Sequence, residues 1–260
     1  FMFARNRDGS LLETDKSVWI QGRFTWLLSH LYNKVEKNTQ WLELAEHGAN
    51  FILKHCFDTD GRMFFSVTRE GRPLRKRRYI FSETFGTIAL AELAKATGRD
   101  DLARSARDLF NLIVRYLNTP GLLLSKIYPK TRVLKGLSVP MILIVTAQIL
   151  RDALNDSSYT QYIDNAIQEI EKDFMKPQFQ AVLETVGHNG EFVDNFDGRM
   201  LCPGHSIEAA WFIMYEGMVR GNDTRLIKLG CTILDWMWTR GWDQEYGGIL
   251  YYRDVKGLPV

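Results

Sequence analysis

The residues best placed to do chemistry are His205 and Glu208, in the stretch CPGHSIEAAWF at 202–212. Pro203 and Gly204 favour a helix that starts here, with His205 in its first turn and Glu208 three residues later on the same face. The positive end of the helix dipole lowers the pKa of a histidine, whereas a carboxylate beside it raises the pKa and can orient the ring. We therefore expect His205 to be a neutral general base with Glu208 as its partner. The alternative is that the two side chains only satisfy each other at a helix start.

A second candidate is Arg23, which has Trp19 before it and Trp26 after it at helical neighbour spacing. No acidic residue stands three or four positions from Arg23, so a routine ion pair along the helix is absent. Guanidinium donors bind sugar oxygens and indole faces cover the apolar side of a sugar ring, so the three residues suit a sugar site. The alternative is an arginine that covers the edge of a tryptophan-rich core and keeps its head in water.

Glu83, in YIFSETFGTIAL at 79–90, also lacks a cationic neighbour at helical spacing. A buried carboxylate needs partners, so Glu83 belongs either to a substrate pocket or to an internal network. A metal site is not expected, because His205 has no second histidine at ligand spacing.

The elements that must position these residues are mostly helices. Apolar residues recur at helical spacing over 15–35, 39–56, 79–97, 100–117, 137–154, 158–174, 204–219 and 223–239. Extended, glycine-turned segments at 57–73, 181–200 and 242–260 separate them. Two helices and a hairpin thus recur about every 60–80 residues, which is too long for common solenoid repeats. We expect an all-α fold, an (α/α)6 toroid or barrel of paired helices with short β-hairpin insertions, as one domain over 1–260.

Composition limits the class of protein. The 260 residues are 45% hydrophobic and carry a net charge of +2, so neither nucleic acid nor an anionic membrane surface is an expected partner. No apolar run approaches the length of a membrane helix. Cys56, Cys202 and Cys231 lie far apart without a CxxC pair, which fits a reducing, cytoplasmic location.

Several stretches, in this order, resemble the N-acylglucosamine 2-epimerase family. They are VWIQGRFTWLLSHLY at 18–32, the segment 64–94 with IFSETFGTIALAELA, SVPMILI at 138–144 and GRMLCPGHSIEAAWF at 198–212. Members of that family are α/α barrels that move the proton at C2 of a ring-opened sugar through an enediolate. The resemblance implies that the family's second catalytic histidine lies beyond Val260 and that the first barrel helix is missing. We therefore expect a barrel that is incomplete at both ends.

The same resemblance implies roles for individual residues. Arg23, the arginine of QGR, is expected to hold the carbonyl end of the sugar and to stabilise the developing oxyanion. His205, the histidine of PGHxxE, is expected to be one acid/base, with Glu208 as its partner. Arg199, in the GR that precedes this motif, is a further candidate for the pocket.

The resemblance also implies a substrate. Cellobiose-epimerising relatives carry a histidine in the helix that reads SVPMILIVTAQIL here, and this chain has none there. We expect interconversion of N-acetylglucosamine and N-acetylmannosamine, with aldose–ketose isomerisation or 2-epimerisation of mannose- or glucose-type sugars as the alternative. No cofactor is expected to be required. Some family members respond to ATP as an effector, and relatives often dimerise, so a homodimer is a candidate assembly.

Two hypotheses of other classes remain open. An inverting glycoside hydrolase on an α/α toroid needs two carboxylates about 6.5–9.5 Å apart, for which Glu83 with Glu208 or Glu184 are the candidates. A non-catalytic binding protein is the other, since mammalian members of the resembling family have been described as renin binders.

Overall fold

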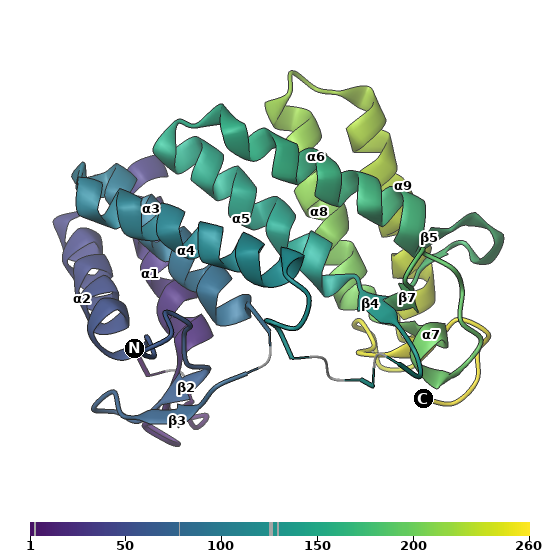
Figure 1. The fold of residues 1–260 in the computed structure, drawn as a ribbon, viewed down its shortest axis with the longest axis horizontal. Coiled ribbons are helices and arrows are strands. Elements are labelled where there is room, and N and C mark those ends of the chain that lie inside the picture. The colour runs from purple at the N-terminus through teal and green to yellow at the C-terminus, as the bar shows by residue number, and fades with distance from the viewer. Residues whose placement is uncertain (3, 78, 125–126, 129) are drawn as a thin grey trace. The chain divides into compact units, whose positions relative to one another are not determined.

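The computed structural model describes residues 1–2, 4–77, 79–124, 127–128 and 130–260. These form two compact units, Phe1–Lys126 with Ile149–Ser158 and Ile127–Gln148 with Tyr159–Val260. Helices dominate both units (Figure 1), which confirms the predicted all-α class. The prediction of one domain over 1–260 stays a prediction.

Four long helices make up most of the first unit: α1 (Val18–Lys34), α2 (Thr39–His55), α3 (Phe81–Thr97) and α4 (Asp100–Asn118). Helix α1 packs against α2 and α3, and α3 packs against α4 (Figure 1). Every residue from 82 to 94 is buried, and a helix that is apolar nearly all round must lie inside its layer. Helix α3 ends at the predicted stop signal, Gly98, whose φ of 70° is the left-handed conformation that glycine adopts without strain.

A small antiparallel sheet completes this unit. Its strands are β1 (Lys16–Ser17), β2 (Ser66–Val67) and β3 (Pro73–Arg75), in the order β1-β2-β3. The predicted hairpin within 57–73 is therefore present, and it turns at Gly71, where φ is 91°. The backbone N–H of Gly71 donates to the carbonyl of Thr68 and closes the turn.

The second unit holds α6 (Thr160–Glu169), α8 (Pro203–Val219), α9 (Thr224–Gly241) and most of α5 (Ser138–Leu154), and α8 packs against α9. Helix α6 continues as a π-helical turn over Ile170–Phe174. Short helical turns span Ser157–Tyr159, Pro177–Phe179 and α7 (Phe196–Arg199). Antiparallel pairs join β4 (Leu134–Gly136) to β7 (Thr185–Gly187), β5 (Met175–Lys176) to β6 (Ala181–Val182) and β8 (Met200–Leu201) to β9 (Arg253–Asp254).

The two segments that suggest a sequence repeat form similar turns. After α2, an isolated bridge pairs Phe57 with Met63, and the N–H of Asp58 donates to the carbonyl of Arg62. After α9, an isolated bridge pairs Trp242 with Ile249, and the N–H of Asp243 donates to the carbonyl of Gly248. A helix followed by an Asp-containing bridged turn is thus a shared local structure.

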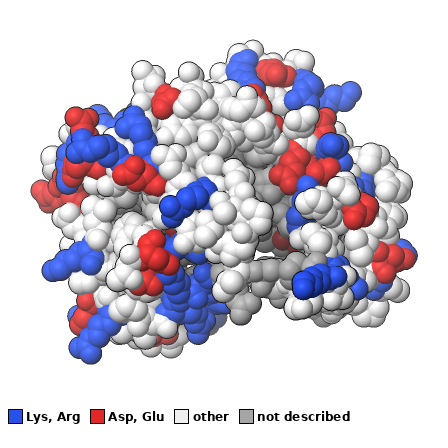
Figure 2. Space-filling view, in the orientation of Figure 1, with Lys and Arg blue, Asp and Glu red and all other residues white. Residues whose placement is uncertain are grey.

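The chain carries 33 basic and 31 acidic residues, so neither sign of charge dominates. Basic and acidic side chains are interspersed on the face that Figure 2 shows, in keeping with the net charge of +2. Among the described residues, no helix combines the length and apolarity that crossing a bilayer requires.

Candidate active site

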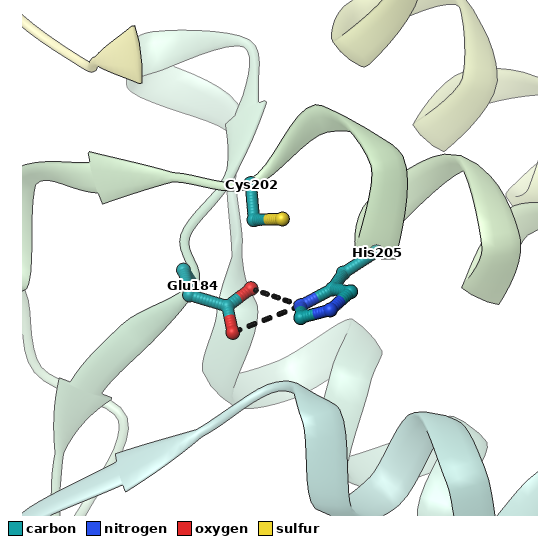
Figure 3. A group of neighbouring side chains, drawn as sticks. All are labelled: Glu184, Cys202 and His205. Carbon is teal, nitrogen blue, oxygen red and sulfur yellow. Dashed lines mark hydrogen bonds and ion pairs between the residues drawn. The ribbon is translucent and has the colours of Figure 1, made fainter. Parts of the chain in front are cut away.

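His205 lies in the first turn of α8 and is paired with a carboxylate. Its Nδ1 is 3.0 and 3.1 Å from the two carboxylate oxygens of Glu184 (Figure 3). No hydrogen bond joins His205 to Glu208 in the described part of the chain, and the catalytic role of Glu208 stays a prediction. The carboxylate comes instead from the connection between β6 and β7, 21 residues earlier in the chain.

The backbone of Glu184 is fixed on both sides by neighbouring segments. Its N–H donates to the carbonyl of Met200 at 2.9 Å, and its carbonyl accepts from the N–H of Leu137 at 3.0 Å. Met200 begins β8, the strand that leads into α8. A backbone hydrogen bond therefore joins the segment that carries Glu184 to the segment that carries His205. This arrangement positions the carboxylate before any ligand arrives.

The pairing decides which ring nitrogen can exchange protons. Both contacts between His205 and Glu184 are made at Nδ1, and the His205 side chain remains 35% exposed. A carboxylate on one imidazole nitrogen keeps the proton there and leaves the other nitrogen as the working atom. Nε2 is therefore the atom of His205 that can take a proton from a substrate or return one to it.

Cys202, the residue before α8, is the third member of this cluster (Figure 3). Its Sγ, a carboxylate oxygen of Glu184 and a ring nitrogen of His205 lie within 4.8 Å of one another. Hydrogen bonding to the Cys202 side chain and then to Glu184 raises the pKa of His205 to about 10, although burial opposes this. This raised pKa favours the imidazolium of His205 at neutral pH, whereas the sequence predicted a neutral ring, and the role of His205 as an acid/base stays a prediction. The helix dipole is outweighed by two neighbouring acceptor groups.

Tyr252 also lies beside this cluster. Its pKa is raised to about 12, chiefly by a hydrogen bond with Tyr251 and by burial, with smaller effects from the charges of Cys202 and Glu184. The sequence offered Glu184 only as a hydrolase carboxylate and gave Tyr252 no mark. Their places depend on distant segments, since the N–H of Glu184 donates to Met200 and the strand after Tyr252, β9, pairs with β8.

In the first unit, Arg23 and Trp19 lie together as predicted. The guanidinium of Arg23 stands 4.2 Å from the ring centroid of Phe85 and 6.0 Å from that of Trp19. The indole N–H of Trp19 donates to Ser82 Oγ at 3.1 Å, which orients the indole ring. The exposed Arg23 thus stands beside an ordered aromatic surface, and its predicted role towards a sugar stays a prediction.

Comparison with known proteins supports the motif-based expectation. The family model for N-acylglucosamine 2-epimerase (GlcNAc 2-epimerase) matches residues 1–260. The chain belongs to this family. It is 31% identical to the N-acylglucosamine 2-epimerase of Bos taurus and 29% identical to that of Homo sapiens, covering 99% of this chain in both cases. The chain spans 63% and 62% of the lengths of these two proteins.

Solved structures show that the fold is shared. The cellobiose 2-epimerase of Bacillus thermoamylovorans B4167 superposes with a TM-score of 0.81 at 18% identity, covering 98% of this chain and 69% of that one. A D-mannose isomerase gives a TM-score of 0.80 at 16% identity, covering 99% of this chain and 69% of that one. This member of the N-acylglucosamine 2-epimerase family therefore shares the fold of these two proteins, which agrees with the predicted α/α architecture.

Trp26 and Glu83, two predicted substrate-binding residues, both contact other protein groups. The ring of Trp26 stacks on that of His30, at 4.9 Å between centroids, and packs against the buried core cluster. Glu83 is fully buried, and its Oε1 accepts from Arg62 Nε at 2.5 Å and from the N–H of Met63 at 2.9 Å. Trp26 Nε1 and Glu83 Oε2 are buried and make no hydrogen bond within the described part of the chain, so the contacts leave the substrate-binding role of both residues a prediction.

Arg199 is also held by protein groups. Its Nε donates to Asp254 Oδ2 at 2.8 Å, and a terminal nitrogen donates to Asp194 Oδ1 at 3.3 Å. The ion pair with Asp254 links the short helix α7 to β9, and β9 pairs with β8, the strand before α8. Arg199 thus braces the segment leading to His205, and its predicted place in the substrate pocket stays a prediction.

Proposed function

We propose that the protein is a sugar 2-epimerase that interconverts N-acetylglucosamine and N-acetylmannosamine. The observation that carries this proposal is His205, with Nδ1 held by Glu184 and with Nε2 left to exchange a proton. Membership of the N-acylglucosamine 2-epimerase family over residues 1–260 supports it independently.

The reaction follows from the chemistry of a ring-opened sugar. The hydrogen on C2 is acidic because its removal leaves an enediolate that the neighbouring carbonyl stabilises. Return of a proton to the opposite face of C2 gives the epimer, so one group removes the proton and a second group on the other face supplies one. No cofactor takes part in this scheme.

His205 enters this scheme as the proton donor. Its raised pKa keeps Nε2 protonated at neutral pH, so Nε2–H returns the proton to C2 and leaves a neutral ring. In the reverse direction, the neutral ring removes the same proton through Nε2. Glu184 holds the Nδ1–H throughout, so that the ring keeps one orientation in both protonation states.

A glycoside hydrolase is less well supported. Such an enzyme needs two carboxylates that face a substrate across a cleft. Glu83 is fully buried against Arg62, and Glu184 is engaged by the His205 ring. Neither group is arranged as a free catalytic acid.

Proton exchange measured by NMR in heavy water tests the proposal with the intact protein. N-acetylmannosamine, mannose and cellobiose are offered separately, and the C2 proton signal is followed. We expect loss of the C2 signal of N-acetylmannosamine together with formation of N-acetylglucosamine. A ketose product from mannose with deuterium at C1 points to an aldose–ketose isomerase, and release of glucose from cellobiose points to a hydrolase. Absence of exchange in all three sugars contradicts the proposed chemistry.

A further inference from the structure

Three potential metal ligands of different chemistry converge beside α8. Glu184 comes from the β6–β7 connection, Cys202 from the residue before the helix and His205 from its first turn (Figure 3). Their ligand atoms lie within 4.8 Å of one another, with 3.0 and 3.1 Å between Nδ1 and the carboxylate oxygens. A single histidine in the sequence motif predicts no metal, but the fold adds a thiol and a carboxylate to it.

We propose that Glu184, Cys202 and His205 form a binding site for a divalent cation that favours sulfur ligands, such as Zn²⁺. Zinc bonds to sulfur at about 2.3 Å and to nitrogen and oxygen at about 2.0–2.2 Å, so tetrahedral ligand atoms stand about 3.4–3.6 Å apart. The spacings in the cluster, from 3.0 Å to at most 4.8 Å, span these values. Small side-chain shifts are enough to place an ion between the three groups.

The ligand set favours a soft or borderline metal over magnesium or calcium. Thiolate and imidazole select zinc and cadmium, whereas the harder cations prefer oxygen ligands alone. Three protein ligands leave a fourth tetrahedral position, as in zinc sites that admit water or a substrate. The side of the cluster formed by His205 is open, since that side chain is 35% exposed, while Cys202 is buried and Glu184 is 15% exposed.

Metal binding changes what the His205 ring can do. Coordination takes the lone pair of Nδ1 and requires Sγ as a thiolate, so the protons of both atoms pass to the buffer as the dication binds. The ring then keeps its proton on Nε2 and has no free nitrogen to accept another. The bound ion is therefore expected to block C2 proton exchange. This consequence rests on the proposed function, but the proposal of the metal site does not.

Titration of the intact protein with Cd²⁺, followed by the thiolate-to-cadmium charge-transfer absorbance, tests the site directly. We expect a band that saturates at one equivalent, disappears in Cys202→Ser and persists in the matched control Cys231→Ser, whose thiol is exposed. Glu184→Gln is expected to weaken binding at least about 10-fold, since even the loss of a residue that only orients a metal ligand costs about 10- to 100-fold. A band that survives in Cys202→Ser, or no band at all, overturns the proposal.

The second readout is NMR of the histidine rings with Zn²⁺, which needs neither a sugar nor the Cys202 variant. Zinc is expected to shift the ring signals of His205 and to leave those of His188, in an exposed turn, unchanged. Equal shifts of both rings, or of neither, contradict the site. Sugar exchange is measured separately with a chelator present, so that a failure of the proposed reaction and a failure of metal binding are told apart.

Discussion

At the scale of single residues, His205 acquires its character from residues outside its own helix. Its position in the first turn of α8 favours the neutral ring, but Cys202 and Glu184 favour the imidazolium more strongly. The sequence could place His205 at a helix start, because Pro203 and Gly204 are local signals. It could not supply Glu184, because that contact depends on how β7 and β8 pair with distant segments.

The first prediction concerns the titration of His205. Its ring is expected to titrate near pH 10 in the intact protein, and Glu184→Gln is expected to move the pKa down towards its ordinary value. The physical reason is loss of the carboxylate that stabilises the imidazolium. NMR of the ring protons against pH measures this, with His188 as the internal reference. A wild-type midpoint near 6.5 would contradict the assigned environment.

The second prediction tests the proton transfer itself. His205→Ala is expected to remove C2 proton exchange and to leave sugar binding within about tenfold, because acid/base chemistry is lost while binding groups remain. His188→Ala, which removes an exposed histidine of the same unit, is the matched control and should keep full exchange. Exchange in His205→Ala at the wild-type rate would take the histidine out of the mechanism.

The third prediction concerns Arg23. Arg23→Lys is expected to lower the turnover of the sugar substrate about 10- to 100-fold, because a lysine is a point charge and cannot reproduce the planar guanidinium fork. Arg104→Lys, an exposed substitution on α4, is the control. Steady-state kinetics of both variants give the comparison. Unchanged kcat/KM in Arg23→Lys would show that the guanidinium does not act on the sugar.

At the scale of elements, the helices were predictable and their packing contacts were not. Apolar periodicity and local stop signals placed most of the long helices to within about three residues. The short helical turn at Phe196–Arg199, inside a segment predicted to be extended, was missed. The buried pair of Glu83 with Arg62 was also beyond the sequence, which left a pocket and an internal network equally open.

The fourth prediction follows from the contact between α1 and α3. Gly22, in the QGR stretch, lies where an added Cβ would stand 2.6 Å from the carbonyl oxygen of Phe85 and 2.8 Å from its Cβ. Since backbone atoms of a buried helix cannot move aside cheaply, Gly22→Ala is expected to lower the free energy of unfolding by about 1–3 kcal/mol. Urea unfolding measures this.

Gly204→Ala is the matched control for this substitution. It makes the same change in a helix, where no atom lies within 4 Å of the added Cβ. Its free energy of unfolding should be equal to that of the wild type or higher by up to about 1 kcal/mol. Equal stability of the two alanine variants would show that close packing is not what requires glycine at position 22.

At the scale of the whole molecule, the cluster of Glu184, Cys202 and His205 belongs to the second unit alone. Its strand partners, its helix and the brace from Arg199 to Asp254 are all parts of that unit. The geometry of the cluster therefore depends on the stability of this unit, and the charge state of His205 is in turn linked to that stability.

The last prediction uses this linkage. The folded-state pKa of His205, about 10, lies above its unfolded value near 6.5, so the folded state binds the proton more tightly. The resulting stabilisation is fully present below pH 6.5 and is lost as the pH rises through about 10. Urea unfolding of wild type and Glu184→Gln at a series of pH values isolates this contribution, because other titrating groups are common to both. The wild type is expected to exceed the variant in free energy of unfolding most clearly near pH 6, with the difference shrinking towards pH 10. A difference that stays constant over this range would mean that Glu184 does not hold a proton on His205.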